Sequence, residues 1–215
     1  MSDFYSEDHR SLQDRYGTRP LADRLEQMIV HSSFDEADTA FIQSREFFFL
    51  STVDSLGHPT VSFKGGSQGF VKVRGNELVI PCYDGNGMFL SVGNIAADPK
   101  VGLLFIDFEK PWRMRVQGVA RLDEGPGVQE VPGAVLLIRI EPKQIFVNCP
   151  RYIPRYAKIE SSKFNPDALG KAPLPEWKRL KEVHDVLLPE DRQAAAAEGL
   201  MSMEEAIASA AREDR

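Results

Sequence analysis

The amino-acid sequence predicts a mainly β protein, an antiparallel β-barrel that is closed or nearly closed and is flanked by helices at both ends of the chain. Between residues 46 and 148, apolar and polar residues repeatedly alternate with the two-residue period of β-strands. Clusters of Gly, Asn, Asp and Pro separate these stretches at short intervals, as in hairpins. About six strands within roughly a hundred residues, interrupted by one short helix, are typical of a small barrel.

Composition and charge restrict the function of this 215-residue chain. Hydrophobic residues make up 42% and charged residues 27%, values typical of a globular protein rather than a disordered one. The net charge of −6 argues against a dedicated nucleic-acid binder, which normally carries a basic surface. No apolar run is long enough to span a membrane, and the charged N-terminus lacks the regions of a signal peptide. We therefore expect a cytoplasmic protein with no membrane and no nucleic-acid partner.

Cysteine and histidine usage predicts neither a disulfide framework nor a metal site. The two cysteines, Cys82 and Cys149, lie outside any CxxC pattern. The four histidines are dispersed, and none lies within metal-ligand spacing of another. Cys149 has no apparent histidine partner that would activate it as a nucleophile. We therefore expect a reduced protein without a bound metal, and the sequence identifies no catalytic residue.

Residues 1–45 are predicted to form an N-terminal helical segment that packs on the barrel. A helix is expected behind Thr18, its candidate N-cap, with Pro20 in the first turn. A second short helix is predicted over 35–43, and only a leading turn is expected before Tyr16. The first helix carries apolar residues at helical spacing, namely Leu21, Leu25, Met28 and Ile29.

Residues 46–150 are predicted to form the barrel core. The aromatic stretch 47–53 is long enough for a strand that is buried on both faces. In the next strand, 60–64, polar and apolar residues alternate, so Thr60, Ser62 and Lys64 share one face. Further strands are expected at 70–73, 77–81, 101–107, 112–122 and 134–147.

One helix is predicted inside the barrel sequence, after the loop 84–87, which offers an Asx residue as a cap. Asp98-Pro99 ends this helix. One of its faces carries Met88, Ser91 or Val92, and Ile95. Beyond the core, 151–215 is predicted to be a loop and helical extension, with a short helix over 175–186 and a longer helical stretch over 193–215. We expect all three segments to form one domain.

A polar stripe on strand 112–122 is the clearest candidate for ligand binding. Strand alternation sends Arg113, Arg115 and Gln117 to one side, where their guanidinium and amide donors can recognise an anionic or carbonyl-rich planar ligand. Taken alone, such a stripe is more often the solvated face of an antiparallel sheet.

Two further features are weaker candidates. The stripe of Thr60, Ser62 and Lys64 leads into Gly65-Gly66, where a ligand can approach the backbone closely, although an edge strand with a bend looks the same. The loop 84–88 offers backbone amides to an anion at a helix start, although such loops are more often only caps. No Walker, GxGxxG or GxSxG motif occurs, which argues against a dinucleotide fold and a serine hydrolase.

The order of these elements resembles the pyridoxamine 5′-phosphate oxidase-like, FMN-binding split-barrel family. Three segments carry the resemblance, namely HPTVSFKGG (58–66), GNELVIPCYDGNGMFLSVGNIAADPKVGLLFIDF (75–108) and WRMRVQGVARL (112–122). The segment IFVNCPRYI (145–153) is similar to an uncharacterised FMN-binding branch rather than to the true oxidase. The chain lacks the family's basic pair before the helix, where Asp84-Gly85-Asn86-Gly87 stands, and the true oxidase's Arg-x-His.

The resemblance implies a six-stranded antiparallel split barrel that forms a homodimer with FMN at the subunit interface. Ser62 and Lys64 would then line the flavin ring and ribityl side. The phosphate and ribityl chain would be bracketed by Asn86, Met88, Ser91 and Asn94. Arg113 and Arg115, supported by Gln117, would contact the phosphate or the ring carbonyls. The partner subunit would contribute Asn148, Arg151 and Tyr152.

The expected function is that of an FMN-dependent oxidoreductase that acts on an unknown small molecule. Two alternatives stay open at this stage. The barrel could be a non-catalytic flavin-binding or redox-sensing module, or a structural barrel without a cofactor. A deazaflavin or haem in place of FMN is also open, because related barrels accept such ligands.

Overall fold

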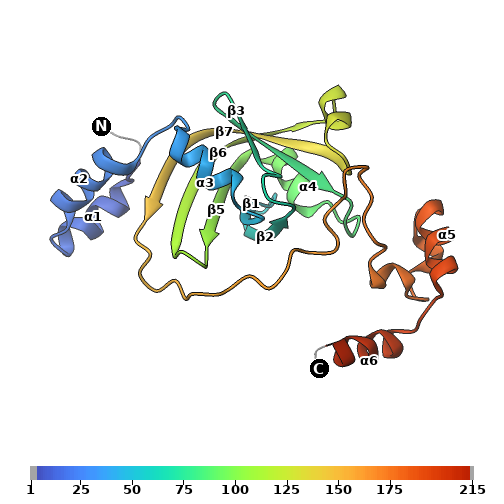
Figure 1. Cartoon of the computed structure of the whole chain (residues 1–215). Helices are drawn as coiled ribbons and strands as arrows, with labels where there is room; N and C mark the ends of the chain where they lie inside the picture. The colour runs from blue at the N-terminus through green and yellow to red at the C-terminus, as the bar shows by residue number, and fades with distance from the viewer. Residues whose placement is uncertain (1–3, 214–215) are drawn as a thin grey trace. The chain divides into compact units, whose positions relative to one another are not determined.

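The computed structural model of the chain describes residues 4–213, with side chains described up to residue 208 (Figure 1). The chain divides into two compact units, Met1–Ser162 and Lys163–Arg215. The first unit contains the sheet, and the described part of the second contains helices, connecting loops and one isolated β-bridge. Across the described residues, no helix is both long and apolar enough to cross a membrane.

The first unit contains an antiparallel sheet of seven strands in the order β2-β1-β5-β6-β7-β4-β3. Figure 1 shows this sheet strongly curved, with α3 and α4 against it and α1 and α2 projecting at one side. The mainly β, split-barrel fold predicted from the sequence is thereby confirmed. The strands are β1 (Phe47–Val53), β2 (Pro59–Gly65), β3 (Lys72–Arg74), β4 (Glu77–Tyr83), β5 (Lys100–Asp107), β6 (Trp112–Asp123) and β7 (Ala134–Asn148).

The strand count and the closure of the sheet differ from the prediction. The sheet has seven strands, one more than the six-stranded barrel that the resemblance implies; the short β3, near the strand expected at 70–73, pairs with β4 through a tight turn at Gly75. Gly75 has a φ of 60°, a left-handed conformation that glycine adopts without strain. Within the described residues, β2 and β3 each pair with one strand only, so the sheet is not closed.

Strand β1 is buried on one face, whereas the sequence predicted burial on both. Phe48, Leu50 and Thr52 are buried, because they point to the inner face of the sheet. Phe47 and Phe49 alternate with them and stay partly exposed on the outer face. They form a ring cluster there, in which Phe47 stacks on Phe63 at 5.4 Å between centroids. An aromatic run therefore marks a strand with one core face and one half-covered outer face.

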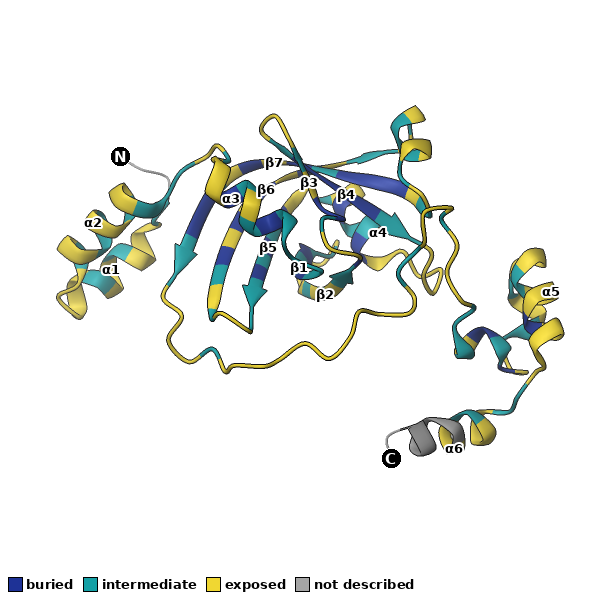
Figure 2. Cartoon of the chain, viewed as in Figure 1, coloured by how far each residue is buried: buried dark blue, intermediate teal, exposed yellow. Residues whose placement is uncertain are grey.

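The hydrophobic core lies inside the curve of the sheet (Figure 2). Every strand except β2 contributes to it or packs against it, and α3 and α4 add Ile42 and Ile95. The largest fully buried side chains are Phe48, Phe105, Ile42, Leu50, Leu78, Ile80, Met114, Leu137, Ile138, Ile140, Ile145 and Val71.

Three helices precede the sheet. The helix predicted behind Thr18 is α2 (Arg19–Ile29), although the Thr18 side chain makes no capping hydrogen bond. The helix predicted over 35–43 is α3 (Glu36–Gln43), whose N-cap Asp35 accepts a hydrogen bond from the Asp38 N–H at 2.8 Å. The leading segment forms a complete helix, α1 (Glu7–Arg15), where the sequence predicted only a turn.

The helix inside the barrel sequence is α4 (Leu90–Ala97). Its N-cap is Phe89, in a left-handed conformation with φ of 50°, rather than the predicted Asx residue. Asn86 instead stabilises a turn in the loop before the helix, where its Oδ1 accepts a hydrogen bond from the Met88 N–H at 3.1 Å. The helix ends at Asp98, as predicted.

In the second unit, the helix predicted over 175–186 is absent. Two short 3₁₀ helices, η2 (Glu176–Arg179) and η3 (His184–Val186), stand there instead. Leu180 adopts an extended conformation between them, because it forms a parallel bridge with Met201. The stretch predicted as helical over 193–215 takes in the end of α5 (Pro189–Glu198), which begins earlier than predicted, and α6 (Met203–Glu213). The two helices are separated at Gly199, and residues 214–215 lie outside the described residues.

Candidate functional site

The arginine stripe on β6 has the orientation that the sequence predicts. Met114 and Val116 are buried in the core, so the alternating residues between them point to the outer face. Arg115 and Gln117 are exposed on that face, and Arg113 is half-buried. The polar side chains therefore lie side by side along one strand, outside the hydrophobic core.

The strand register extends this outer face onto β7. Arg113 is the register partner of Asn148, and Arg115 is the partner of Phe146. Register partners in an antiparallel pair point to the same face of the sheet. Asn148 therefore joins Arg113 within one chain, and its place beside Arg113 does not depend on a second copy.

Two polar atoms at this position are buried without a hydrogen-bond partner. They are Nε of Arg113, which is a donor, and Oδ1 of Asn148, which is an acceptor. Burial of an unsatisfied polar group costs about 1–3 kcal/mol, so native proteins rarely retain one without a reason. A ligand that offers one acceptor and one donor side by side would satisfy both atoms.

The neighbouring cations are also without carboxylate partners. Among the described residues, neither Arg115 nor Arg151 forms an ion pair, and the Arg115 guanidinium lies 5.9 Å from the centroid of the Phe146 ring. Tyr152 follows Arg151 and is 93% exposed, with a φ of 70° that is unusual for a residue other than glycine. In a chain with more acidic than basic residues, unpaired arginines are typical of an anion-binding surface.

A second group of predicted site residues lies under α4, where it forms a hydrogen-bonded cluster. Ser62 on β2 and Ser91 on α4 bring their hydroxyl oxygens to 3.0 Å. Asn94 donates from Nδ2 to Oγ1 of Thr52 at 3.0 Å and to Oγ1 of Thr60 at 3.2 Å. These bonds fix α4 on β1 and β2, so the cluster has a structural role in the chain by itself.

Lys64 lies on the same inward face of β2 as Ser62, as the alternation predicts. Among the described residues it forms no ion pair. Burial raises the pKa of the Cys82 thiol on β4, and the positive charge of Lys64 partly opposes that rise. Burial likewise raises the pKa of Tyr83. Lys64 therefore places an unpaired cation beside the end of β4.

The loop before α4 contains the remaining predicted residues, Asn86 and Met88. Both side chains are exposed. The Oδ1 of Asn86 accepts a hydrogen bond from the Met88 backbone N–H, and the Nδ2 of Asn86 donates to the Met88 sulfur. The turn closed by the Asn86–Met88 hydrogen bond orients the backbone N–H groups of this loop. The loop carries no basic residue to neutralise a phosphate, as the sequence indicates.

The predicted residues thus fall into two groups on opposite faces of the sheet. Lys64 pairs with Phe48, which points into the core, whereas the adjacent Phe63 pairs with Phe49 on the outer face. The register continues from Phe49 through Leu104 to Arg115, so the arginine stripe shares the face of Phe63. Within one chain, the two groups therefore do not share a face of the sheet.

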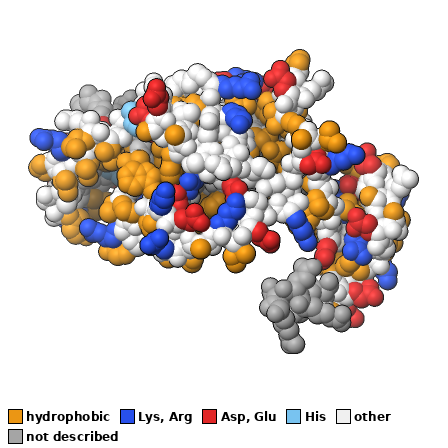
Figure 3. Space-filling model, viewed as in Figure 1, with side chains coloured by type: hydrophobic (Ala, Val, Ile, Leu, Met, Phe, Trp, Pro, Cys, Tyr) orange, Lys and Arg blue, Asp and Glu red, His pale blue; other side chains and the backbone are white. Residues whose placement is uncertain are grey.

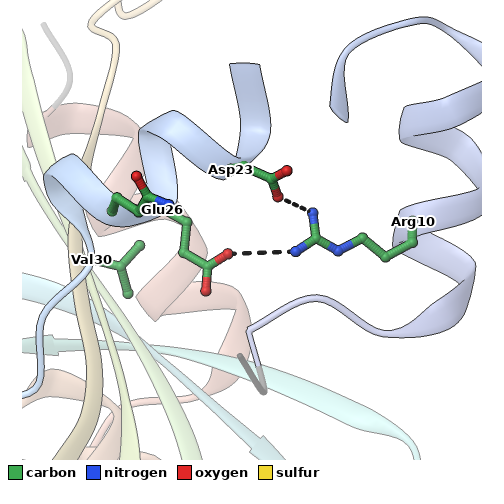
Figure 4. A pocket seen from close by; sticks show the side chains of 5 residues that line it. Arg10, Asp23, Glu26 and Val30 are labelled. Carbon is green, nitrogen blue, oxygen red and sulfur yellow. Dashed lines mark hydrogen bonds and ion pairs between the residues drawn. The ribbon is translucent and has the colours of Figure 1, made fainter. Parts of the chain in front are cut away.

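Sequence reasoning did not foresee a hollow of about 400 Å³ on the N-terminal helices. Figure 4 shows Arg10 of α1 turned toward Asp23 and Glu26 of α2. Val30 and Gln27 complete its lining. Arg10 forms ion pairs with Asp23 and Glu26, so its charge holds α1 to α2 and is not free to bind a ligand in the hollow.

The structure also brings together His31, Asp35 and Asp38, whose ligand atoms lie within 4.8 Å of one another. The sequence did not indicate this group, because Asp35 and Asp38 read as a helix start and His31 as a lone histidine. Nε2 of His31 lies 2.7 Å from Oδ2 of Asp38, and the same oxygen accepts a bond from the Asp35 N–H. The hydrogen bonds between Asp35 and Asp38 are those of the cap of α3, and His31 adds one contact to Asp38.

Comparison with known proteins identifies the family. The family model described as pyridoxamine 5′-phosphate oxidase matches residues 34–149, which is more than half of the chain. The chain belongs to the pyridoxamine 5′-phosphate oxidase family. In this family member the matched region runs from the start of α3 to the end of β7, so it contains every strand. A search among curated proteins gives no match.

Solved structures are similar to part of this family member at low sequence identity. A putative pyridoxamine 5′-phosphate oxidase from Lactobacillus delbrueckii is 20% identical, with a TM-score of 0.44 over 55% of this chain and 99% of that one. An FAD-binding protein from Mesorhizobium loti is 14% identical, with a TM-score of 0.39 over 56% and 97%. The haem storage protein HutZ from Vibrio cholerae is 19% identical, with a TM-score of 0.40 over 54% and 94%.

Proposed function

We propose that the chain is an FMN-binding flavoprotein and an FMN-dependent oxidoreductase that acts on a small molecule. The observation that carries the proposal is the pair of unsatisfied buried atoms, Nε of Arg113 and Oδ1 of Asn148. The pyrimidine edge of a flavin presents carbonyl oxygens and an imide N–H side by side, which complements one donor and one acceptor. A phosphate offers only acceptors and would leave Asn148 unsatisfied.

The charges around this pair suit the rest of the cofactor. Arg115 and Arg151 supply cations without carboxylate partners for the phosphate dianion or the ring carbonyls. When bound, FMN supplies hydride or electron transfer, and a cation beside the pyrimidine edge favours its anionic reduced form. In this proposal Arg113 holds that edge, Asn148 fixes its orientation, and no side chain acts as a nucleophile.

We further propose a homodimer in which each FMN lies between two copies. Arg113 and Asn148 lie on the outer face of the sheet, whereas Ser62 and Lys64 lie on the inner face of β2. FMN in contact with both groups therefore needs Arg113 and Asn148 from one copy and Lys64 from the other. The loop at Asn86 would approach the same ligand from the copy that supplies Lys64.

The visible spectrum of the purified protein, followed by identification of the released chromophore by mass, tests the cofactor. We expect a yellow protein that releases FMN on denaturation. Release of a deazaflavin would agree with the proposed contacts to the pyrimidine edge, but the cofactor would then be the deazaflavin and not FMN. Haem, or a colourless protein that takes up no added FMN, would refute the proposal.

The catalytic part of the proposal has a separate test. Reduction by NADPH or another donor, followed by rapid reoxidation with turnover, is expected of an oxidoreductase. A flavin that stays bound without turnover would instead identify a flavin-binding or redox-sensing module. A cytoplasmic location is also proposed, supported by the two free cysteines, Cys82 and Cys149.

A further inference from the structure

The N-terminal arm (residues 4–31, which contain α1 and α2) contacts β7 at both of its ends. At one end, Phe4 packs edge to face on Phe146, with 5.4 Å between the ring centroids. At the other end, the His31 N–H donates to the Ile145 carbonyl at 3.0 Å, and the Ile145 N–H donates to the His31 carbonyl at 2.7 Å. Neither helix between these ends buries a residue, and Figure 3 shows hydrophobic side chains at the surface over them, at the left of the view. The two ends of the arm therefore hold two consecutive residues of one strand.

Phe146 is buried although it lies on the outer face of the sheet. Only 6% of it is exposed, whereas its register partner Arg115 is exposed on the same face. The preceding residue, Ile145, points the other way and belongs to the hydrophobic core, of which Phe146 is not a member. Because Phe4 packs on Phe146, the arm covers part of the face that carries the arginine stripe.

The Phe146 ring in turn contacts the Arg115 side chain. The Arg115 guanidinium lies 5.9 Å from the centroid of that ring, within the range of a cation–π interaction. Among the described residues, Arg115 forms no ion pair that would hold it elsewhere. Arginine has many rotamers, so a fixed ring beneath the guanidinium reduces the entropy that ligand binding would cost. A contiguous chain of rings thus leads from Phe4 to Arg115.

The folded arm fixes the position of Phe4. The Tyr5 ring packs edge to face on Phe4, with 4.7 Å between the centroids. The Tyr5 hydroxyl donates to the Ala22 carbonyl on α2 at 3.3 Å, and the Arg10 guanidinium lies 4.6 Å from the centroid of the Tyr5 ring. Arg10 also forms an ion pair with Asp23 of α2. Phe4 is therefore placed by both helices of the arm.

We infer that Phe4 is a positioning residue, which through Phe146 holds the Arg115 guanidinium for the phosphate of the flavin and makes the site selective for FMN over riboflavin. The inference rests on the proposed function, in which Arg113 holds the pyrimidine edge. Arg115 stands two residues further along the same strand, a separation of about 7 Å. The carbonyl oxygens of one pyrimidine edge lie closer together than this, which leaves Arg115 for the phosphate dianion.

Titration of the full-length, flavin-free protein with FMN and with riboflavin tests the selectivity. Phe4→Ala should weaken FMN binding by about 3- to 10-fold and leave riboflavin binding unchanged, because riboflavin lacks the phosphate. Phe4→Tyr keeps the ring and should behave as the wild type does. Tyr16→Ala is the matched control, because it removes a ring from the same arm that is 74% exposed. Equal weakening of both flavins in Phe4→Ala, or the FMN-to-riboflavin ratio of Tyr16→Ala, would overturn the inference.

The mobility of the Arg115 side chain gives a second readout, which needs no flavin. NMR relaxation of the Arg115 Nε in the flavin-free protein should show more motion in Phe4→Ala than in wild type or Tyr16→Ala. Exchange of the Ile145 amide should stay slow, because His31 still accepts its hydrogen bond. Unchanged Arg115 mobility would overturn the positioning role. Faster Ile145 exchange would also overturn it, because Phe4 would then attach the whole arm.

The wild type separates this inference from the proposed function. Equal affinity of the wild type for FMN and riboflavin would overturn the phosphate contact and leave the flavin site standing. A wild type that binds neither flavin would refute the proposed function and the selectivity together. Arg115 mobility in Phe4→Ala would still decide in that case whether Phe4 positions the arginine.

Discussion

Arg113 and Asn148 face each other across β6 and β7, and each keeps one buried polar atom without a hydrogen bond. The two atoms are a donor and an acceptor, yet they do not bond to each other. Each costs about 1–3 kcal/mol in the free chain. A ligand that satisfies both recovers this free energy on binding, so the pair stabilises the complex at the expense of the free chain.

The variant Asn148→Leu separates the cost of the unsatisfied acceptor in the free chain from its contribution to ligand binding. Without the buried acceptor, the flavin-free variant should be as stable as the wild type or more stable by about 1 kcal/mol in urea unfolding. FMN binding should weaken by about 10- to 100-fold, because the imide N–H loses its acceptor. Equal losses of stability and of FMN affinity would instead identify Asn148 as a purely structural residue.

Arg113→Ala should weaken FMN binding by about 10- to 100-fold, since a hydrogen bond to a charged group contributes about 1.5–3 kcal/mol. It should also make the bound flavin harder to reduce, because the cation that favours its anionic form is gone. Fluorescence titration and the reduction potential measure the two effects. Arg121→Ala is the matched control, because Arg121 lies on the same strand and already bonds Glu77 at 2.9 Å. Equal FMN affinity in the two variants would contradict the site.

The faces of single strands were predictable from the sequence, because alternation is local to a strand. It correctly placed Arg113, Arg115 and Gln117 together, and it placed Ser62 with Lys64. It does not say which face of a strand is the inner one. On β2 the polar face turns inward, because Ser62 and Thr60 meet the polar side chains of α4 there.

The relation between strands could not be read from the sequence. Asn148 stands beside Arg113 because of the β6–β7 register, which shifts at a bulge between Gln117 and Gly118. Leu180 leaves its predicted helix because it bridges Met201, a contact across twenty-one residues. Both outcomes depend on tertiary pairing, and a local pattern contains no information about it.

Asn94→Ala tests whether α4 is positioned by its polar cluster. The variant loses the hydrogen bonds to Thr52 and Thr60, whose hydroxyls still bond each other at 2.8 Å. We therefore expect the flavin-free chain to lose about 1 kcal/mol of stability, measured by urea unfolding. Amide hydrogen exchange should rise in α4 and not in β7. An unchanged stability with reduced FMN affinity would instead make Asn94 a direct cofactor contact.

The segment that follows β7 is attached through Glu46, and acid should release it. The Lys158 ammonium donates to the Glu46 carboxylate at 2.7 Å and holds the pKa of that carboxyl below its usual range. A lowered pKa in the folded chain means that the contact stabilises the fold above the ordinary glutamate pKa and is lost as the pH falls through the folded value. Glu46→Gln should therefore cost up to about 1 kcal/mol at neutral pH, as a surface pair does, and the difference from wild type should vanish in acid. Exchange of the Lys158 amide, which donates to Glu109, reports the release, and Lys143→Gln, which removes a surface pair with Glu141, is the control. A Glu46→Gln deficit that persists in acid would contradict the role of the Glu46 charge.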